Sequence, residues 1–287
     1  MKKKKVLVLG SAGMAGHIIT LYLNECGYDV TGFSLFENTV YKGIVGDATD
    51  SALIKRIVDE GNFDFIINCI GILNQFAESN HPNAILLNSY LPHYLVKLTE
   101  NMKTRIIHMS TDCVFSGDRG GYKKDDVRDG QTFYDRTKAL GEIEDDKNVT
   151  LRNSIVGPDI NEKGIGRLNW FMQQENSING YTRAVWTGQT TLQLAKTMDA
   201  VMQNGATGLY NSVPECSITK YELLRLFNHY LRNDALTINP VDGTCLDKSL
   251  VSTPFEFGYT IPTYEVMVKE MADWIFAHKK LYPHYTL

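Results

Sequence analysis

The sequence predicts an α/β fold in which helices cover both faces of a parallel sheet, and two observations carry this prediction. Short apolar runs such as Val6–Leu9 and Phe63–Ile70 alternate along the chain with segments of helical periodicity. These runs are apolar at nearly every position, which is typical of strands buried on both faces of a parallel sheet. A repeated strand-helix order of this kind indicates a doubly wound fold.

The first strand and helix are marked most clearly. Val6–Leu9 is apolar and β-branched and leads into a glycine-rich loop, and Met14–Cys26 then places apolar residues at helical spacing. Gly27 is suited to end this helix, because glycine readily adopts the left-handed conformation that follows many helices. Asp29–Phe33 is expected to form the second strand.

The next helices and strands are expected before residue 103. Thr49 and Asp50 can cap a helix that ends at Gly61, and Phe63–Ile70 follows as a buried strand. Pro82 is expected to open a longer helix that runs to about Met102, because proline is tolerated in the first turn of a helix.

The last elements of the sheet follow the same rhythm. Arg105–Met109 is a strand that runs directly into polar residues, a helix is expected around Tyr134–Glu144, and Val149–Ile155 is the next strand. From Gly157 the sequence becomes rich in loops and aromatic residues. One further helix and strand, at about Leu192–Val213, could return to the sheet.

Composition limits the classes of partner. A formal net charge of −4 gives no electrostatic case for binding nucleic acid or an anionic membrane. The apolar run after Lys2–Lys5 is too short for a signal peptide, and no apolar segment is long enough to cross a membrane. The five cysteines form no CxxC pair, and no set of residues has metal-ligand spacing, so we expect reduced thiols in a cytoplasmic protein without a metal.

A chemical motif lies between the first strand and the first helix, where glycine recurs at every third position: Gly10-Ser11-Ala12-Gly13-Met14-Ala15-Gly16. The glycines permit a tight turn and let a pyrophosphate approach the helix N-terminus, whose free N–H groups and dipole favour negative charge. The motif therefore predicts a dinucleotide site in a Rossmann-like domain, the alternative being a plain tight turn.

The choice between NAD(H) and NADP(H) depends on the end of the second strand. An NAD site usually has an acid there for the ribose 2′-hydroxyl, but the sequence offers Ser34, and the first acid is Glu37. The missing acid favours NADP(H), although no arginine stands nearby. Asp47 and Ala48 follow the expected third strand, where Asp47 could accept a hydrogen bond from adenine or could cap a helix.

Tyr134 and Lys138 stand four positions apart in an expected helix, so both side chains share one face. A neighbouring ammonium, aided by the positive charge of an oxidised nicotinamide, stabilises a phenolate and lowers the pKa of the tyrosine. Such a tyrosine can give a proton to a carbonyl oxygen while hydride arrives at carbon. Thr111 follows the preceding strand, and its hydroxyl can bond the same oxygen.

These motifs resemble the extended short-chain dehydrogenase/reductase superfamily, and within it most closely the dTDP-4-dehydrorhamnose reductase family of sugar-nucleotide reductases. "STDCVFSG" is similar to the S-T-D-Y-V-F-x-G of that family, and "YDRTKALGE" to its Y-x-x-T-K-x-x-G-E. "LRNSIVG" is similar to its L-R-T-S-x-x-(Y/G)-G. The likeness covers roughly residues 5–213 and continues loosely beyond them.

The resemblance implies roles for residues at matching positions. Thr111, Tyr134 and Lys138 would be catalytic, and Lys138 would also hold the nicotinamide ribose. The glycine motif, Asp47 with Ala48, and the backbone of Cys69-Ile70-Gly71 would hold the cofactor. We expect residues 1–156 to form an NAD(P)-binding Rossmann domain to which about 187–213 return. Residues 157–186 and 214–287 would then form a smaller C-terminal lobe that binds the substrate.

Asn88 is a further catalytic candidate. Pro92, four residues later in the expected helix, has no N–H for the carbonyl of Asn88. In the superfamily an asparagine in this helix supports a water that links the lysine to solvent, so the freed carbonyl could hold that water. The alternative is a kinked helix with a buried asparagine.

Other residues are candidates for substrate contact. Asp112 could touch the sugar or only shape a turn, and Cys113 stands where the family usually has tyrosine, which leaves the sugar and its nucleotide open. Trp170 and Trp186 could stack on a base or a sugar, or could pack in the core. Arg152 could reach a diphosphate or pair with an acid.

The resemblance implies a reductase of a nucleotide-activated 4-keto-6-deoxy sugar for surface polysaccharide synthesis. A 4-epimerase, a combined epimerase-reductase and a dehydratase use the same scaffold, but a dehydratase normally has an Asp-Glu pair where Asp112 is followed by Cys113. A regulatory subunit that binds NADP(H) without catalysis is an alternative of another class. Homodimers are common in the superfamily, and the sequence identifies no interface.

Overall fold

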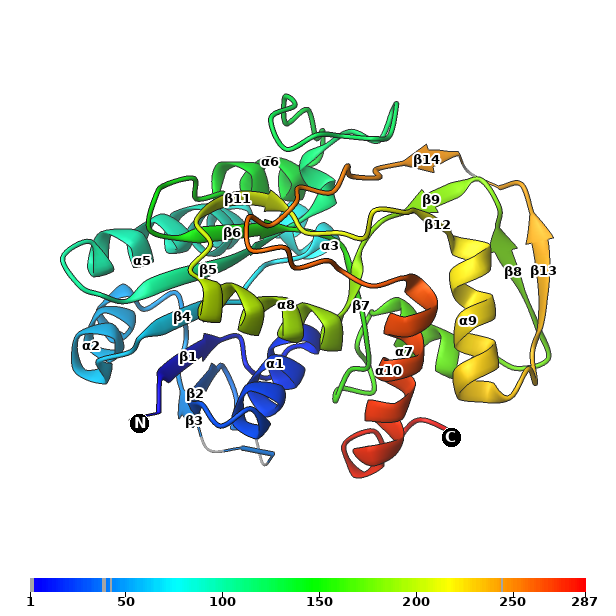
Figure 1. The fold of residues 1–287 in the computed structure, drawn as a ribbon, viewed down its shortest axis with the longest axis horizontal. Helices are drawn as coiled ribbons and strands as arrows, with labels where there is room; N and C mark the ends of the chain where they lie inside the picture. Colours follow the sequence, from blue (N-terminus) through cyan, green and yellow to red (C-terminus); the bar gives the residue numbers. More distant parts are fainter. Residues whose placement is uncertain (1–2, 38–39, 42, 244) are drawn as a thin grey trace.

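The computed structural model describes residues 3–287 except 38–39, 42 and 244. Its centre is a parallel sheet in the order β11-β6-β5-β4-β1-β2-β3 (Figure 1). The strands of this sheet are β1 (Lys5–Leu9), β2 (Asp29–Ser34), β3 (Gly43–Val45), β4 (Phe65–Asn68), β5 (Arg105–Ser110), β6 (Val149–Arg152) and β11 (Gly208–Asn211). The predicted α/β doubly wound fold is confirmed.

The strand order changes direction at β1, which pairs with β2 on one side and with β4 on the other. In open α/β sheets, ligands bind beyond the carboxyl ends of the strands at such a point. The segments that follow β1 and β4 are therefore the first place to look for a site.

Helices cover both faces of the sheet because β1 sends alternate side chains to opposite sides. Val6 and Val8 pack with α1 (Met14–Glu25) and α8 (Thr191–Asn204). Leu7 and Leu9 belong instead to a core built with α2 (Ser51–Gly61) and α5 (Leu91–Thr99). Both faces are thus closed to water, which accounts for the apolar composition of the strands.

The long helix predicted from Pro82 to Met102 is wrong in detail. The structure has α3 (Asn74–Ser79), α4 (His81–Ala84), a π-helical segment (Ile85–Tyr90) and then α5. In the π-helical segment the N–H of Leu91 donates to the carbonyl of Leu86, five residues earlier. The wider turn precedes Pro92, which cannot donate to the ladder.

Two other predicted boundaries need correction. The helix expected around Tyr134–Glu144 is α6 (Phe133–Leu140), and it ends before Gly141, whose Cα packs against the backbone of Asn88. The strand expected at Val149–Ile155 divides into β6 and β7 (Ile155–Val156), and β7 pairs in parallel with β10 (Gln189–Thr190). Contacts distant in sequence decide both boundaries.

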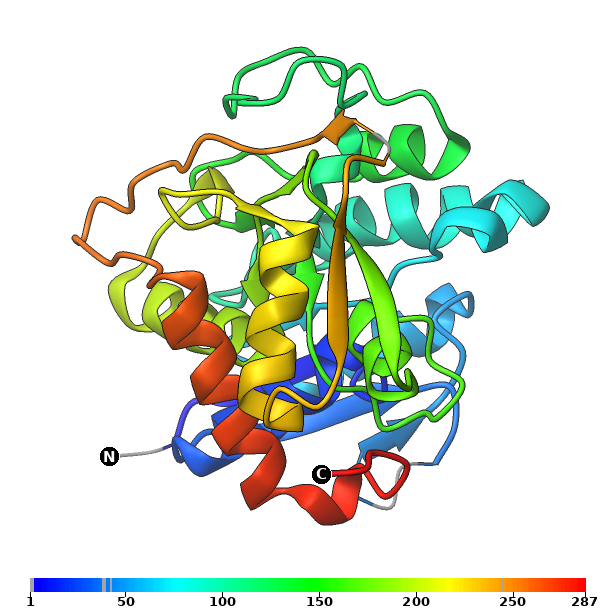
Figure 2. The ribbon, with the colours of Figure 1, turned by 90° about the vertical axis from the view of Figure 1, so that its right-hand side faces the viewer.

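A smaller group of elements lies beside the sheet, at the right of Figure 1 and facing the viewer in Figure 2. It has its own apolar core, in which α7, α9 and α10 pack together. Its elements are α7 (Arg167–Met172), β8 (Ser177–Tyr181), β9 (Ala184–Trp186), β12 (Ile218–Thr219), α9 (Lys220–Arg232), β13 (Thr237–Val241), β14 (Leu246–Asp247) and α10 (Tyr264–Ala277). Short 3-10 turns occur at Asp112–Val114 and Lys279–Leu281. In the described part of the chain, no helix has the length and apolar character needed to span a bilayer.

Candidate active site

The glycine motif forms the turn between β1 and α1. Gly10 has a φ of +80°, and a Cβ there would lie 3.2 Å from the backbone of Cys69 and Ile70. A Cβ on Gly16 would lie 2.1 Å from the carbonyl oxygen of Gly10. No side chain caps the N-terminus of α1, whose Ncap is Gly13, so its first N–H groups are free to face an anion.

A cavity of about 320 Å³ lies where β1, β2 and β4 end. Ala12, Ser34, Asp47 and Ala48 line it together with Gly10, Gly13 and Cys69-Ile70-Gly71. Asp47 is exposed and accepts a hydrogen bond from the N–H of Thr49 at 2.9 Å, whereas Asp50 caps α2. Ser11 does not line this cavity: its side chain is buried against Gly32 of β2.

A second cavity, of about 380 Å³, joins the glycine loop to the candidate catalytic side chains. Gly13, Met14 and Gly16 line one side, and Thr111, Tyr134 and Lys138 line the other. Cys69-Ile70-Gly71, Asp112 and Cys113 also contribute. Segments far apart in the sequence thus meet beyond the carboxyl ends of β1, β4 and β5.

Strand β5 ends at Ser110, and the next residues turn back at once. Thr111 caps the 3-10 turn: its Oγ1 accepts from the N–H of Cys113 and donates to Oδ1 of Asp112, both at 3.1 Å. Burial raises the pKa of Asp112, while the Thr111 hydroxyl and the positive charge of Lys248 lower it. Asp112 thus has a turn-forming role and also faces the cavity.

Helix α6 positions Tyr134 and Lys138. Thr132 and Asp135 form a reciprocal capping box that fixes its first turn. One turn apart on the buried face, Tyr134 and Lys138 are 7% and 4% exposed. The ammonium of Lys138 donates to the carbonyl of Met109 at 2.7 Å, which ties α6 to β5.

Burial dominates the titration of both side chains. It lowers the pKa of Lys138 to about 8, and the carboxylate of Glu142 opposes this change. It raises the pKa of Tyr134 well above its ordinary value, and the Cys113 thiol adds to this effect. The expectation that Lys138, aided by an oxidised nicotinamide, lowers the pKa of Tyr134 stays a prediction.

The sequence leaves open whether Arg152 reaches a diphosphate or pairs with an acid. In the structure it pairs with an acid. It is fully buried, and its Nε and Nη2 donate to the two oxygens of Glu142 at 2.8 and 2.7 Å. Glu142 also accepts from Oγ of Ser110 at 2.6 Å. Glu142 thus joins the ends of β5 and β6 to the segment that follows α6. It ends the "YDRTKALGE" motif, but the sequence alone did not single it out.

Asn88 lies in the π-helical segment and is fully buried. Its Oδ1 accepts from the N–H of Ile72 at 2.8 Å, and its Nδ2 donates to the carbonyl of Ile72 at 3.0 Å and to Oγ1 of Thr137 at 3.1 Å. The side chain thus fixes the loop after β4 to α6. None of these bonds reaches Lys138, and the role of its carbonyl in holding a water stays a prediction.

A third cavity, of about 790 Å³, continues from Asp112 and Cys113 toward the smaller lobe. Trp186 lines it and packs on Tyr264 with ring centroids 5.6 Å apart. Trp170 does not line it, and is 43% exposed on α7. Arg167 and Lys220 do line it, although nothing near either residue in the sequence marks it as part of a site.

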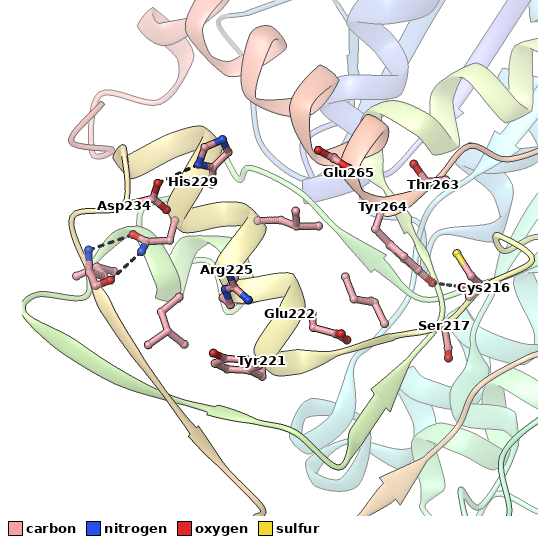
Figure 3. Close-up of a pocket in the computed structure, with 15 residues that line it drawn as sticks. Cys216, Ser217, Tyr221, Glu222, Arg225, His229, Asp234, Thr263, Tyr264 and Glu265 are labelled. Atoms are coloured by element: carbon pink, nitrogen blue, oxygen red, sulfur yellow. Dashed lines mark hydrogen bonds and ion pairs between the residues drawn. The ribbon is translucent and has the colours of Figure 1, made fainter.

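A separate hollow of about 850 Å³ lies over α9 and the start of α10 (Figure 3). Tyr221, Arg225 and His229 of α9 line it, and none of the candidate catalytic residues does. Size alone therefore does not identify the site, which is better defined by the meeting of the glycine loop with Thr111, Tyr134 and Lys138.

Known proteins resemble this chain over different lengths. A dTDP-4-dehydrorhamnose reductase of Mycobacterium tuberculosis is 31% identical over 147 residues, so the match spans 49% of this chain but only 45% of that protein. A probable low-salt glycan biosynthesis reductase of Haloferax volcanii is 30% identical and matches 90% of this chain and 94% of its own length.

The fold is also shared with solved structures. A dTDP-4-dehydrorhamnose reductase of Bacillus anthracis in complex with NADP superposes with a TM-score of 0.77, at 19% identity, over 96% of this chain and 100% of that one. The profile of the RmlD substrate binding domain matches residues 4–247. The resemblance read from the motifs is thereby confirmed, and the chain belongs to the RmlD substrate binding domain family of extended short-chain dehydrogenases/reductases.

Proposed function

We propose that this protein reduces a nucleotide-activated 4-keto-6-deoxy sugar with NAD(P)H, in the manner named for its relatives. The observation that carries the proposal is the cavity of about 380 Å³ that joins the glycine loop to Thr111, Tyr134 and Lys138. Residues 1–156 and about 187–213 would hold the cofactor, and the remaining segments would hold the sugar nucleotide.

The residues present fit a dinucleotide. Side chains at Gly10 and Gly16 would clash with the backbone after β4 and with the backbone of the loop itself, so the glycines permit its tight turn, and the uncapped N-terminus of α1 suits a pyrophosphate. The cavity at Ser34, Asp47 and Ala48 would hold the adenosine, and the backbone at Cys69-Ile70-Gly71 would line its path. When bound, the cofactor supplies the hydride that reaches the keto carbon.

The chain itself supplies the proton and the polarisation of the carbonyl. Tyr134 gives its phenolic proton to the keto oxygen, and Lys138 holds a positive charge beside the phenolate that forms. Thr111 donates a hydrogen bond to the same oxygen, for which its hydroxyl must turn away from Asp112. These roles need a cavity that excludes water, and Tyr134 and Lys138 are buried.

For the cofactor, we favour NADP(H) over NAD(H), but by a small margin. Ser34 at the end of β2 offers no charge that would repel a 2′-phosphate. Among the described residues that line the adenosine cavity, however, there is no lysine or arginine to bind one. We expect NADPH to be preferred by no more than about 10-fold, which is worth about 1.4 kcal/mol.

The test is oxidation of NADPH and NADH by the purified protein with dTDP-, UDP- and GDP-4-keto-6-deoxy sugars, with and without a 3,5-epimerase. Oxidation with one sugar, lost in Tyr134→Phe, supports the proposal and identifies the nucleotide. Clear cofactor binding without oxidation would contradict it. That result would favour a 4-epimerase, which consumes no cofactor, or a regulatory subunit.

A further inference from the structure

The cavity of about 790 Å³ beside the catalytic side chains is positively charged. Of the described residues that line it, four are cations and two are carboxylates: Lys163, Arg167, Lys220, Lys248, Asp112 and Asp159. The surplus of positive charge contrasts with the formal net charge of −4 of the whole chain. A cavity of this kind attracts an anionic ligand against the overall charge of the protein.

Two of these cations have no directly bonded counter-ion within the described chain, although the negative charge of Asp112 also acts on Lys220. Neither Arg167 nor Lys220 forms an ion pair or a side-chain hydrogen bond with any described residue. Lys248 differs, since its Nζ lies 3.8 Å from the carboxylate of Asp135. Glu222 is the nearest acid along α9 to Lys220, and its carboxylate is already bonded to the N–H and hydroxyl of Thr219 at 2.9 and 2.8 Å.

The fold brings the two cations together from distant parts of the sequence. Arg167 is the first residue of α7, Lys220 is the first residue of α9, and these helices pack against each other. Burial lowers the pKa of Lys220, and the positive charge of Arg167 lowers it further, while the carboxylate of Asp112 opposes this change. Like charges held on one cavity wall repel, and a bound anion relieves that repulsion.

The chemistry of the pair suits phosphate. The planar guanidinium of an arginine binds two phosphate oxygens at once, and a lysine ammonium adds a point charge. Two cations on the wall match the two negative charges of a diphosphate diester better than a neutral sugar. The same cavity reaches Asp112 and Cys113, which also line the cavity that holds Thr111 and Tyr134.

Building on the proposed function, we infer that Arg167 and Lys220 bind the diphosphate of the nucleotide sugar. In that position they direct the sugar ring toward Thr111 and Tyr134. They are positioning residues, because they act on a part of the substrate that does not react. They also select nucleoside diphosphates over monophosphates, because a single phosphate engages only part of the pair.

The test is the affinity of dTDP, UDP and GDP and of the matching monophosphates for the protein saturated with NADPH, measured by calorimetry. We expect the best diphosphate to bind at least about 10-fold more tightly than its monophosphate. Arg167→Gln and Lys220→Gln should each lower the affinity for that diphosphate by about 10- to 100-fold, the usual range for a lost charge-assisted contact. The affinity for the monophosphate should fall less in the same two variants.

Arg225→Gln is the matched control. It removes a positive charge from the same helix as Lys220, but Arg225 faces the separate hollow (Figure 3). We expect unchanged nucleotide affinity in this variant. Thermal stabilisation by NADPH checks that every variant is folded.

The outcomes separate this inference from the proposed function. If the variants bind the diphosphates like the unmodified protein, or if no diphosphate binds at all, the inference is wrong. In a protein that reduces a sugar nucleotide, the variants should raise KM with a much smaller change in kcat, and unchanged KM overturns the inference while the function stands. Selective diphosphate binding without turnover supports the inference and removes the reductase proposal.

Discussion

Lys138 and Tyr134 lie one helical turn apart, and their surroundings set the pH range in which they can act. Because burial lowers the pKa of Lys138 to about 8, its ammonium is mostly present at pH 7 and is lost as the pH rises through 8. The positive charge that stabilises the Tyr134 phenolate disappears over the same interval.

The loss of this positive charge at high pH leads to a prediction for turnover. We expect kcat to fall as the pH rises above about 8, approaching 10-fold for each further pH unit. The measurement is the kcat profile from pH 6 to 10, in buffers of constant ionic strength. A kcat that stays level to pH 10 would show that the charge on Lys138 does not limit the reaction.

Single residues also show how far the sequence can lead. The meeting of Thr111, Tyr134 and Lys138 at one cavity was predictable, because each lies in a short motif whose spacing has a chemical reason. The place of Arg167 and Lys220 in a site was not predictable, because each is an isolated cation in the sequence. The two come together only where α7 packs against α9. Ser11 stands inside the glycine motif, yet its side chain turns toward Gly32.

At the scale of elements, the π-helical segment at Ile85–Tyr90 is the feature that periodicity could not reveal. Apolar spacing predicts a helix there, but it does not distinguish the wider turn that precedes Pro92. The end of α6 is similar: its periodicity continues, but the close contact between Gly141 and the backbone of Asn88 is tertiary. The strand and helix order was predictable, whereas these boundaries were not.

Asn88 connects two of these elements, and its replacement separates structure from catalysis. We expect Asn88→Ala to lower stability by about 1–3 kcal/mol, because the backbone N–H and carbonyl of Ile72 lose their partner. If the carbonyl of residue 88 holds a water for Lys138, Pro92→Ala should instead change the pH profile of kcat with little loss of stability. Denaturation in urea and the profile of each variant decide between these effects, and unchanged turnover in both rules out the water relay.

Helix α1 is also joined to the C-terminal segment, through His17. Its Nε2 shares a hydrogen bond with the hydroxyl of Tyr282 at 2.9 Å, and burial lowers the pKa of His17 to about 4. Unfolded, this histidine takes up its proton near pH 6.5, whereas the folded protein resists protonation until about pH 4. The folded state is therefore disfavoured progressively as the pH falls from 6.5 to 4.

The size of this effect can be measured. Two to three pKa units correspond to a loss of about 3 kcal/mol of unfolding free energy between pH 7 and pH 4. We expect His17→Gln to be less stable at pH 7 but to lose less stability over this range than the unmodified protein. Urea denaturation of both proteins at pH 7 and pH 4 tests this prediction. Equal losses of unfolding free energy in the two proteins would assign the acid sensitivity to other groups.

At the scale of the whole molecule, a sheet with both faces covered places the glycine loop, Thr111, Tyr134 and Lys138 beyond the same edge. The Rossmann-like part was predictable because its motifs follow regular strands and helices. The arrangement of the smaller lobe was not, because its strands are short and pair with distant segments, as β12 does with β9. That lobe contributes the positive cavity wall on which the proposed substrate depends.

The proposed reaction requires that hydride reaches the sugar and stays there. The direct measurement is incubation with NADPH carrying deuterium at the transferred position of the nicotinamide C4, together with the keto sugar nucleotide found in the oxidation assay, followed by NMR of the product. We predict one deuterium at C4 of the 6-deoxy sugar for each cofactor oxidised, and none with Tyr134→Phe. A sugar without deuterium and a cofactor that stays reduced would contradict the account.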